Sequence, residues 1–485
     1  MNQPNKESDF SSLGFGLEDR PPIGQALVLA AQHVLTMFGA TVAVPLMLGP
    51  LSADGSGMGM SLEQVSILIS SVMLCSGIAT FIQVTFGSRL PIIQGVSFSF
   101  LAAFIAIIVT VKNEGGQPAE IMQYIAGAIL IGAAIEMLIG FSGLIGLVRR
   151  FLSPVVIGPV IMLIGLALYG AGAPMAGQSW PISILTIGLV IVFSYVLSRK
   201  HTLFRLFPIL LAILISVGVC GLLTVLGVVD ESHAAYIQTD HIAAASWLRV
   251  SPAEVVLPWG VPKFHFGFFL AVLAGYLASM IESFGDYHAC SQLAGGENPT
   301  PKQISRGLGC EGIGCAITGL LGGFSSTSYS ENVGLIGLTK VGSRFVVQIA
   351  AAILILLGLF GKFGAVAASI PTPIVGGLYC ALFGLISAVG IRELNKADLN
   401  VDRNLFIAGF ALFMGLSVPY YFNSPPGAEA LDYVGQYSTG LRDVIGAIGK
   451  TGMAVAAIIG LALDNTLPAT PQQRGLNVSL ERSGK

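Results

Sequence analysis

Charged residues are scarce in this sequence. Asp, Glu, Lys and Arg make up 10% of its 485 residues, whereas a typical soluble domain carries about 25%. Hydrophobic residues account for 54% of the chain. This balance excludes an ordinary soluble domain and predicts a polytopic membrane protein. The net charge of −2 gives no reason to expect a nucleic-acid partner.

Two other signals are missing. The six cysteines lie in or beside apolar runs without CxxC spacing, so we expect no metal centre or disulfide framework and no cofactor. Residues 1–22 lack the apolar stretch of a signal peptide, and the first hydrophobic run is long enough to span a membrane. We expect no cleavable signal, with cytoplasmic tails at 1–24 and 466–485 and location in the plasma or inner membrane.

Long apolar runs are what the sequence has instead. Together with two polar-broken segments at 92–111 and 324–339, they predict about fourteen crossings. The other runs lie at 26–49, 66–86, 121–147, 155–173, 182–198, 206–228, 268–291, 308–321, 345–361, 366–389, 405–421 and 444–463. With the N-terminus inside, 18 of the 24 basic residues fall on the inner side, as the positive-inside rule requires.

The fold class we predict is an all-α membrane protein with an inverted repeat. The longest loop, 229–267, separates two halves of about seven crossings, and an odd number forces opposite orientations. The broken segments come third in each half, as RLPIIQGVSFSF (89–100) and GGFSSTSYSENVG (322–334). Paired broken segments predict short extended stretches and half-helices that face each other at a midplane site. Two ordinary kinked helices are the simpler alternative.

Three carboxylates in these spans point to binding. Glu331 begins the second half-helix, and a carboxylate in a bilayer costs at least ~2.5 kcal/mol. Glu282 and Asp286 are four residues apart in the eighth span and therefore share a helix face. They repel each other, so a proton or a Na⁺ ion between them would relieve the cost. Both could instead lie in a polar loop near the cytoplasmic end of the helix.

Further candidates surround these acids. His33, beside Gln32 in the first span, is either a satisfied interior histidine or part of the same polar pocket, and the hydroxyl of Ser328 suits a cation. Glu136 and Glu311 could each bridge helices, whereas Tyr287 and His288 are assigned to other faces of the eighth span. Free N–H groups at 96–98 and 329–331 could bind carbonyl oxygens. These segments add Ser97, Phe98, Tyr329 and Ser330 to the predicted substrate site.

The donor set suits a planar heterocycle. Glu282 and Glu331 would accept hydrogen bonds from ring N–H groups, and Phe98 offers an aromatic face. Such pairing discriminates strongly, because an unmatched buried polar group is costly.

Several motifs resemble those of the nucleobase–ascorbate transporter family, also called nucleobase:cation symporter-2. They include QHVLTMFGATVAVP (32–45), IESFGDYHAC (281–290), ENVG (331–334), TKVGSRFVVQ (339–348) and LALDNTLPATPQQRG (461–475). The resemblance covers nearly all of residues 21–475. It implies a core domain (26–147 and 265–362) that moves like an elevator against a gate domain (153–229 and 365–465). It also implies a homodimer and coupling of substrate transport to H⁺ or Na⁺.

By position, the resemblance implies that Glu282, Glu331 and Phe98 contact the substrate. Uracil carriers of the family have Glu where this chain has Glu331, whereas ascorbate carriers have Pro and many xanthine or urate carriers have Gln. The flanking motifs look closer to the ascorbate branch. Proton-coupled uracil carriers have His at the position of Asp286, so Asp286 favours Na⁺, for which it would be a ligand. We expect a nucleobase, uracil first and purines second.

The rival hypotheses are three. Sodium-coupled transport of ascorbate or another organic anion would use the same fold, although an anion would meet two site carboxylates. An intramembrane aspartyl protease is suggested by Asp286 after Phe284 and Gly285, but it needs a second aspartate in a facing helix. A channel is disfavoured, because inverted repeats with broken helices indicate alternating access.

Overall fold

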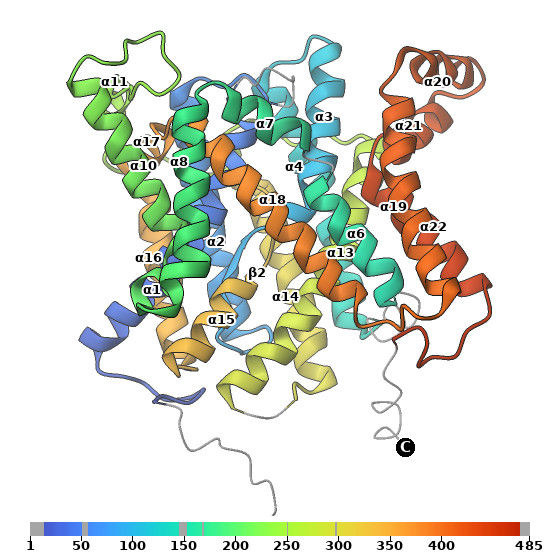
Figure 1. Ribbon diagram of the computed structural model, residues 1–485, viewed down its shortest axis with the longest axis horizontal. Helices are drawn as coiled ribbons and strands as arrows, with labels where there is room; N and C mark the ends of the chain where they lie inside the picture. Colours follow the sequence, from blue (N-terminus) through green and yellow to red (C-terminus); the bar gives the residue numbers. More distant parts are fainter. Residues whose placement is uncertain are drawn as a thin grey trace, which may run out of the picture.

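A computed structural model describes residues 14–50, 57–144, 153–166, 169–249, 251–295 and 298–475. Helices dominate it, and one short two-stranded sheet lies in the middle of the bundle (Figure 1). The first half contains α1 (Ile23–Leu48), α2 (Leu62–Thr85), β1 (Gln94–Val96), η1 (Phe98–Phe100), α3 (Leu101–Asn113), α4 (Pro118–Ser142), α6 (Pro154–Leu166), α7 (Tyr169–Gly177), α8 (Trp180–Ile191), η2 (Val192–Val196), η3 (Leu197–Arg199), α9 (Thr202–Leu206) and α10 (Pro208–Val225).

The second half repeats the order of long helix, long helix, strand and half-helix. It contains α11 (Asp240–Ala244), α12 (Pro252–Val255), α13 (Phe266–Ala294), α14 (Pro301–Leu320), β2 (Ser326–Ser328), α15 (Ser330–Thr339), α16 (Arg344–Leu359), α17 (Gly361–Ala368), α18 (Thr372–Leu394), α19 (Asp402–Phe422), α20 (Pro425–Tyr437), α21 (Thr439–Gly449) and α22 (Gly452–Thr466). The predicted all-helical membrane fold is confirmed.

Eight helices in the described ranges are long and apolar enough to cross a membrane. They are α1, α2, α4, α8 with its continuation to Arg199, α10, α13, α18 and α19. Four shorter apolar helices accompany them: η1 with α3, α6, α16 and α22. The total of fourteen crossings and the repeat remain predictions.

Three predicted runs are interrupted in the structure. The run at 155–173 divides into α6 and α7, with 167–168 outside the described residues. The run at 366–389 lies across a break before α18, where Pro371 cannot continue a helix from the preceding residue. The run at 444–463 contains the junction between α21 and α22. Residues 145–147 of the run at 121–147, like 1–13 and 476–485 of the predicted tails, lie outside the described residues.

Local sequence explains where the main helices begin and end. Ser61 and Gln64 form a reciprocal capping box at the start of α2, and Thr300 and Gln303 do the same at α14. In α14 a proline also occupies the first turn, where its missing N–H costs nothing. Helix α4 ends at Gly143, whose φ of 74° suits a residue without a side chain.

The broken segments meet as an antiparallel pair. Strand β1 pairs with β2, so that Gly95 lies opposite Thr327, and all six strand residues are buried. Ser97 N donates to Ser325 O at 3.0 Å and Tyr329 N donates to Ile93 O at 3.1 Å, which extends the pairing beyond the strands. Backbone polar groups that would be costly in the middle of a membrane are therefore satisfied between the halves of the chain.

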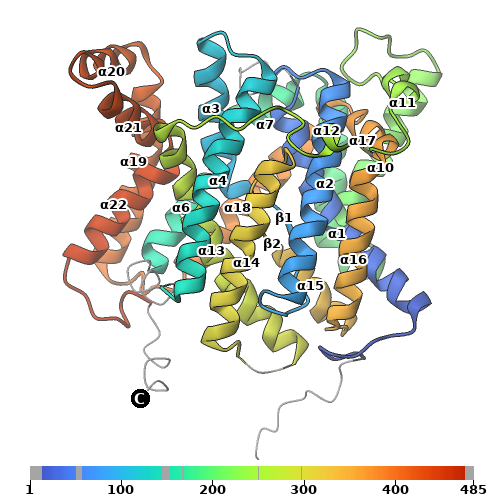
Figure 2. The same ribbon diagram turned by 180° about the vertical axis from the view of Figure 1, so that it is seen from behind.

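Helices from opposite halves pack closely on both sides of this sheet. Helix α2 packs on α16, and α4 packs on α14 (Figure 2). Both contacts rely on glycine. A Cβ added at Gly358 would lie 2.4 Å from the Leu74 backbone N, and one at Gly140 would lie 2.3 Å from the Gly309 N. Close backbone approach through small residues is a common way to join helices in membranes.

Substituting Gly140 with Ala should therefore destabilise the protein. The added methyl group meets backbone atoms of α14 that cannot rotate away, and overpacking of this kind costs about 1–3 kcal/mol. Gly188→Ala is the matched control, because a Cβ there has nothing within 4 Å. We expect thermal unfolding in detergent to begin at a lower temperature for Gly140→Ala only; equal midpoints for both variants would contradict this packing.

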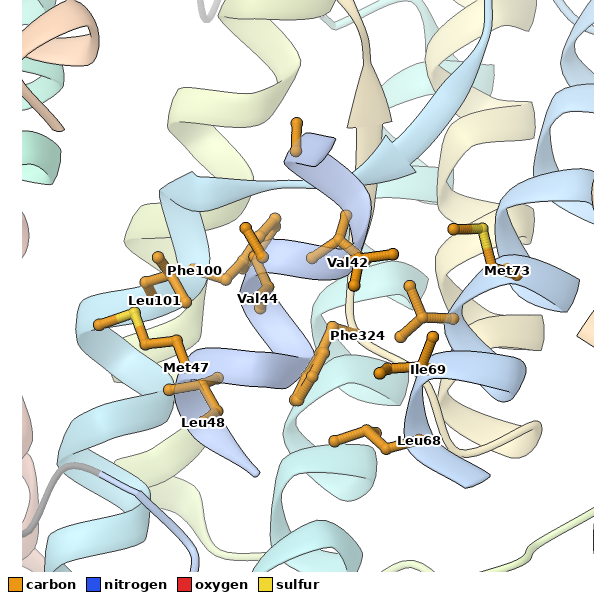
Figure 3. Packing of buried hydrophobic residues seen from close by; sticks show 14 of the residues in the cluster. Val42, Val44, Met47, Leu48, Leu68, Ile69, Met73, Phe100, Leu101 and Phe324 are labelled. Atoms are coloured by element: carbon orange, nitrogen blue, oxygen red, sulfur yellow. The ribbon is translucent and has the colours of Figure 1, made fainter. Parts of the chain in front are cut away.

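The apolar core surrounds the sheet. Buried side chains of α1, α2 and the third segment interlock around Phe324, which precedes β2 (Figure 3). Phe324 packs against Phe104 with ring centroids 5.3 Å apart. The broken segments are thus packed into one apolar core, which also includes Val375, Tyr379 and Phe383 of α18.

The ends of the described chain lie on one side of the molecule, at the lower edge in Figure 1. Residues 466–475 are tied to α19 and α22 by a buried carboxylate. Asp464 Oδ1 forms an ion pair with Arg403 at 3.0 Å, and its Oδ2 accepts a hydrogen bond from Arg474 at 2.7 Å. Asn404 also donates to Gln473 O at 2.6 Å. This C-terminal segment is consequently a folded part of the protein.

Candidate functional site

A large cavity lies beside the two-stranded sheet. Its volume is about 900 Å³, and it is bounded by β1, β2 and α13 on one side and by α6 and α18 on the other. Six of the predicted substrate residues line it: Ser97, Phe98, Glu282, Tyr329, Ser330 and Glu331. The candidate cation residues Asp286 and Ser328 line it as well. The structure therefore brings together residues that are far apart in the sequence.

Asp286 is held by hydroxyl groups. Ser328 Oγ donates to its Oδ2 and Ser330 Oγ donates to its Oδ1, both at 2.7 Å. Asp286 is only 7% exposed, so these bonds replace most of its contact with water. Within the described ranges, no group of three His, Cys, Asp or Glu side chains is placed to hold a metal ion. A cation here would rely on one carboxylate with hydroxyl and backbone oxygens, which are ligands that hard cations accept.

Glu282 and Glu331 present their side chains to the cavity. Both have accessible surface, although protein surrounds the space into which they project. Glu282 lies one helical turn before Asp286 on α13, and Glu331 lies in the first turn of α15. A carboxylate in the first turn of a helix is stabilised by the helix dipole. Two acceptors from different helices thus face the same space.

The aromatic and backbone groups are only partly as predicted. Phe98 is half-buried and lines the cavity. Tyr329 instead turns its hydroxyl away to donate to Val96 O at 2.8 Å. The N–H groups of Ser97 and Tyr329 are used by the extended strand pairing, so they are not offered to a ligand. The side chain of Ser97 accepts from Ser99 N at 3.2 Å.

His33 lies outside the cavity lining. It is buried in α1, and Asn332 Nδ2 donates to its backbone oxygen at 2.9 Å and lies 3.2 Å from its Nδ1. The histidine therefore connects α1 to α15 directly behind Glu331. Any part that it has in cation coupling would act through Asn332.

The sequence analysis did not predict a buried polar network around Glu311. Glu311 of α14 accepts from Ser279 at 3.1 Å, from Ser283 at 2.8 Å and from Tyr287 at 2.8 Å. Ser328 Oγ in turn lies 3.0 Å from Ser283 Oγ. The assignment of Tyr287 to an unrelated face of α13 missed this contact. The spacing of four residues between 279, 283 and 287 was the available signal, because it makes one polar stripe along the helix.

The far wall of the cavity was also missed. Ile157, Ile161 and Ile164 of α6 form an apolar surface opposite the carboxylates. Arg392, Glu393 and Lys396 at the end of α18 line the cavity, together with Gln472 and Gly475 of the C-terminal segment. Arg392 and Lys396 are among the basic residues that the positive-inside rule assigned to the cytoplasmic side.

Comparison with known proteins places these features in a family. The Permease family profile (Xan_ur_permease) matches residues 24–424. The chain is 37% identical to mouse "Solute carrier family 23 member 2", over 96% of this chain and 76% of that protein. It is 34% identical to "Nucleobase-ascorbate transporter 2" of Arabidopsis thaliana, over 96% of this chain and 91% of that protein.

Solved structures share the fold. "The transmembrane domain of a cyanobacterium bicarbonate transporter BicA" matches with a TM-score of 0.54 and 16% identity, over 90% of this chain and all of that chain. SLC26A9 matches with a TM-score of 0.53 and 11% identity, over 92% of this chain and 66% of that one. At these identities the likeness concerns the fold alone.

Proposed function

Since the chain belongs to the Permease family, and is therefore a multi-pass membrane transporter and not an enzyme, we propose that it carries a nucleobase, uracil first, together with a cation. The observation that carries the proposal is the pair Glu282 and Glu331, which face one cavity from two different helices, α13 and α15. Both can accept hydrogen bonds from the N–H groups of a planar ring. Phe98 lies in the same cavity as an aromatic surface for that ring.

The cation binds beside the base in this proposal. Asp286 is one helical turn from Glu282, and its two serine donors sit at the junction of β2 and α15. A Na⁺ ion there would neutralise part of the charge of three carboxylates in one cavity. Binding of cation and base would then depend on each other, which is the requirement for coupled transport.

The proposed transport movement is an elevator-like displacement of the core domain against the gate domain. The core, α1–α4 with α13–α16, carries the carboxylates, whereas the gate, α6–α10 with α18–α22, supplies the isoleucine wall. Helix α17, which lies at the predicted boundary, packs on α2 of the core. The cavity reaches the end of α18 that we predict to be cytoplasmic, and with that orientation the conformation would be an inward-facing one. Two chains would form a homodimer through the gate domains, with the tails in the cytoplasm.

Uptake of labelled uracil into proteoliposomes tests the function. We expect uptake to saturate and to rise with an inward Na⁺ gradient at fixed pH. Uptake that follows only a proton gradient would replace Na⁺ with H⁺ and keep the nucleobase. Unlabelled xanthine, adenine, guanine, urate and ascorbate serve as competitors. Failure of uracil with entry of a purine or of ascorbate would overturn the assignment.

An organic anion such as ascorbate is the second candidate. Arg392 and Lys396 line the cavity and would attract an anion towards it. Relatives named nucleobase-ascorbate transporters leave both substrate classes open. The three carboxylates deeper in the cavity oppose this candidate unless cations neutralise them.

Replacing Glu331 with Gln should change substrate preference. A glutamine keeps one acceptor oxygen but adds an N–H₂ donor, which suits a base with a different order of donors and acceptors. We expect uracil uptake to fall by roughly tenfold or more, since a hydrogen bond to a charged group contributes about 1.5–3 kcal/mol. Xanthine should become the better competitor. Unchanged ranking of uracil and xanthine would remove Glu331 from the contact with the base.

A further inference from the structure

Glu136 is a buried carboxyl group that the proposed transport site does not use. It lies in α4, its side chain is 0% exposed, and neither of its carboxyl oxygens receives a hydrogen bond from the described residues. A carboxylate taken out of water without donors is strongly unfavourable, because the cost of burying a bare charge is several kcal/mol or more. The neutral acid is far less costly to bury. The surroundings of Glu136 therefore favour the protonated form.

Glu311 is a second buried carboxyl group, and it lies across the contact between α4 and α14 from Glu136. Its charge acts on Glu136, and the thiol of Cys315 lies beside them. The backbones approach closely here: a Cβ on Gly312 would lie 2.8 Å from the backbone N of Met137, the residue after Glu136. Tyr276, Glu282 and Tyr287 of α13 are titratable groups that interact electrostatically with the pair.

The two acids have opposite surroundings. Glu311 accepts three hydrogen bonds, from Ser279, Ser283 and Tyr287, which is the environment of an ionised carboxylate. Glu136 has none from the described residues. Two adjacent buried carboxyl groups cannot both ionise without severe repulsion, and one proton between them removes it.

We propose that Glu136 and Glu311 form a proton-binding site inside the core domain, separate from the cavity and holding one proton at neutral pH, with that proton on Glu136. The ligand is H⁺, and Glu311 remains the ionised partner. A core that carries the pair with one proton has one negative charge fewer to move through the bilayer. The inference rests on the proposed function only for this role in transport, because the site itself can be tested without any substrate.

Ser283 connects the site to the cavity. Its hydroxyl donates to Glu311, and the hydroxyl of Ser328, which lines the cavity, lies 3.0 Å from it. Chains of hydroxyl and carboxyl groups of this kind are the usual carriers of protons inside membrane proteins. The proton on the pair should accordingly exchange with water through the cavity.

Infrared spectroscopy of the purified full chain tests the proposal. A protonated carboxyl group has a C=O stretching band that is absent from carboxylates and amides and that shifts in D₂O. At neutral pH the wild-type protein should show such a band that Glu136→Gln lacks. Glu120→Gln is the matched control on the same helix, because Glu120 forms an ion pair with Lys263 at 2.6 Å and is not part of the buried pair. Its spectrum should keep the full band.

Glu136→Asp covers a failure of Glu136→Gln to fold, because it keeps the carboxyl group and should keep a shifted band. Ser283→Ala should keep the band but slow its shift after transfer to D₂O. Equal carboxylic-acid bands in wild type and in folded Glu136→Gln would overturn the site, as would an unshifted band in Glu136→Asp. Equal exchange rates in Ser283→Ala and wild type would overturn the connection. These readouts stand whether or not uracil is the substrate.

Discussion

Replacing Glu282 with Gln is expected to abolish accumulation of substrate. The side chain projects into the cavity one turn from Asp286, so it contacts both the base and the cation in the proposed site. Glutamine has nearly the same shape but loses the charge and one acceptor. Loss of a charged hydrogen bond lowers affinity by roughly ten- to a hundredfold, and loss of the coupling charge removes the driving force as well.

Glu393→Gln is the control for this experiment. Glu393 also lines the cavity, but at the end of α18, where it pairs with Lys396 at 2.5 Å. We expect uptake within about twofold of wild type, because an exposed ion pair contributes at most about 1 kcal/mol. Normal accumulation by Glu282→Gln, or equal losses in both variants, would refute the assignment of Glu282.

Replacing Asp286 with Asn should remove the response to Na⁺. The aspartate accepts hydroxyl groups on both of its oxygens, whereas asparagine has one acceptor and would direct N–H₂ towards one of these serines. The cation also loses the negative charge that Asp286 supplies to its site. We expect Na⁺-driven uptake to fall by at least roughly tenfold, with weaker loss of substrate exchange at equal Na⁺ on both sides.

Asp398→Asn serves as the comparison, since the Asp398 side chain accepts from Asn400 in an exposed turn and is not among the residues that line the cavity. Initial uptake rates over a series of Na⁺ concentrations test whether Asp286 contributes to the cation site. A normal Na⁺ curve in Asp286→Asn would place the cation elsewhere. If the wild-type protein responds to a proton gradient and not to Na⁺, the same variants are compared in that gradient.

The location of the site could be predicted because polarity within an apolar run is a local property of the sequence. Glu282, Asp286 and Glu331 stood out for that reason, and the structure places all three around one cavity. The pairing of β1 with β2 was not predictable in the same way. Strand register depends on contacts between residues more than 200 positions apart, such as Gly95 and Thr327. The prediction of free N–H groups at Ser97 and Tyr329 was wrong because both groups donate hydrogen bonds in that strand pairing.

Other parts of the site depend on packing between helices. The sequence shows Glu311 as an isolated acid, and only the approach of α13 to α14 reveals its three donors. In the sequence, the isoleucines of α6 cannot be distinguished from lipid-facing residues. Their place in the cavity wall depends on how α6 packs opposite the sheet. His33 was open to two interpretations, and its contact with Asn332 depends on how α1 meets α15.

The hydrogen bonds between β1 and β2 have a mechanical consequence for selectivity. They fasten the segment before Phe98 to the segment before Glu331, while α13 touches both β2 and η1. The spacing between Phe98, Glu282 and Glu331 is thus set by one cross-linked frame, whichever side of the membrane the cavity opens to. A carrier built in this way recognises its cargo by the same geometry at entry and at release. In the proposed mechanism, release would then follow departure of the cation or dilution of the substrate and would not require this frame to loosen.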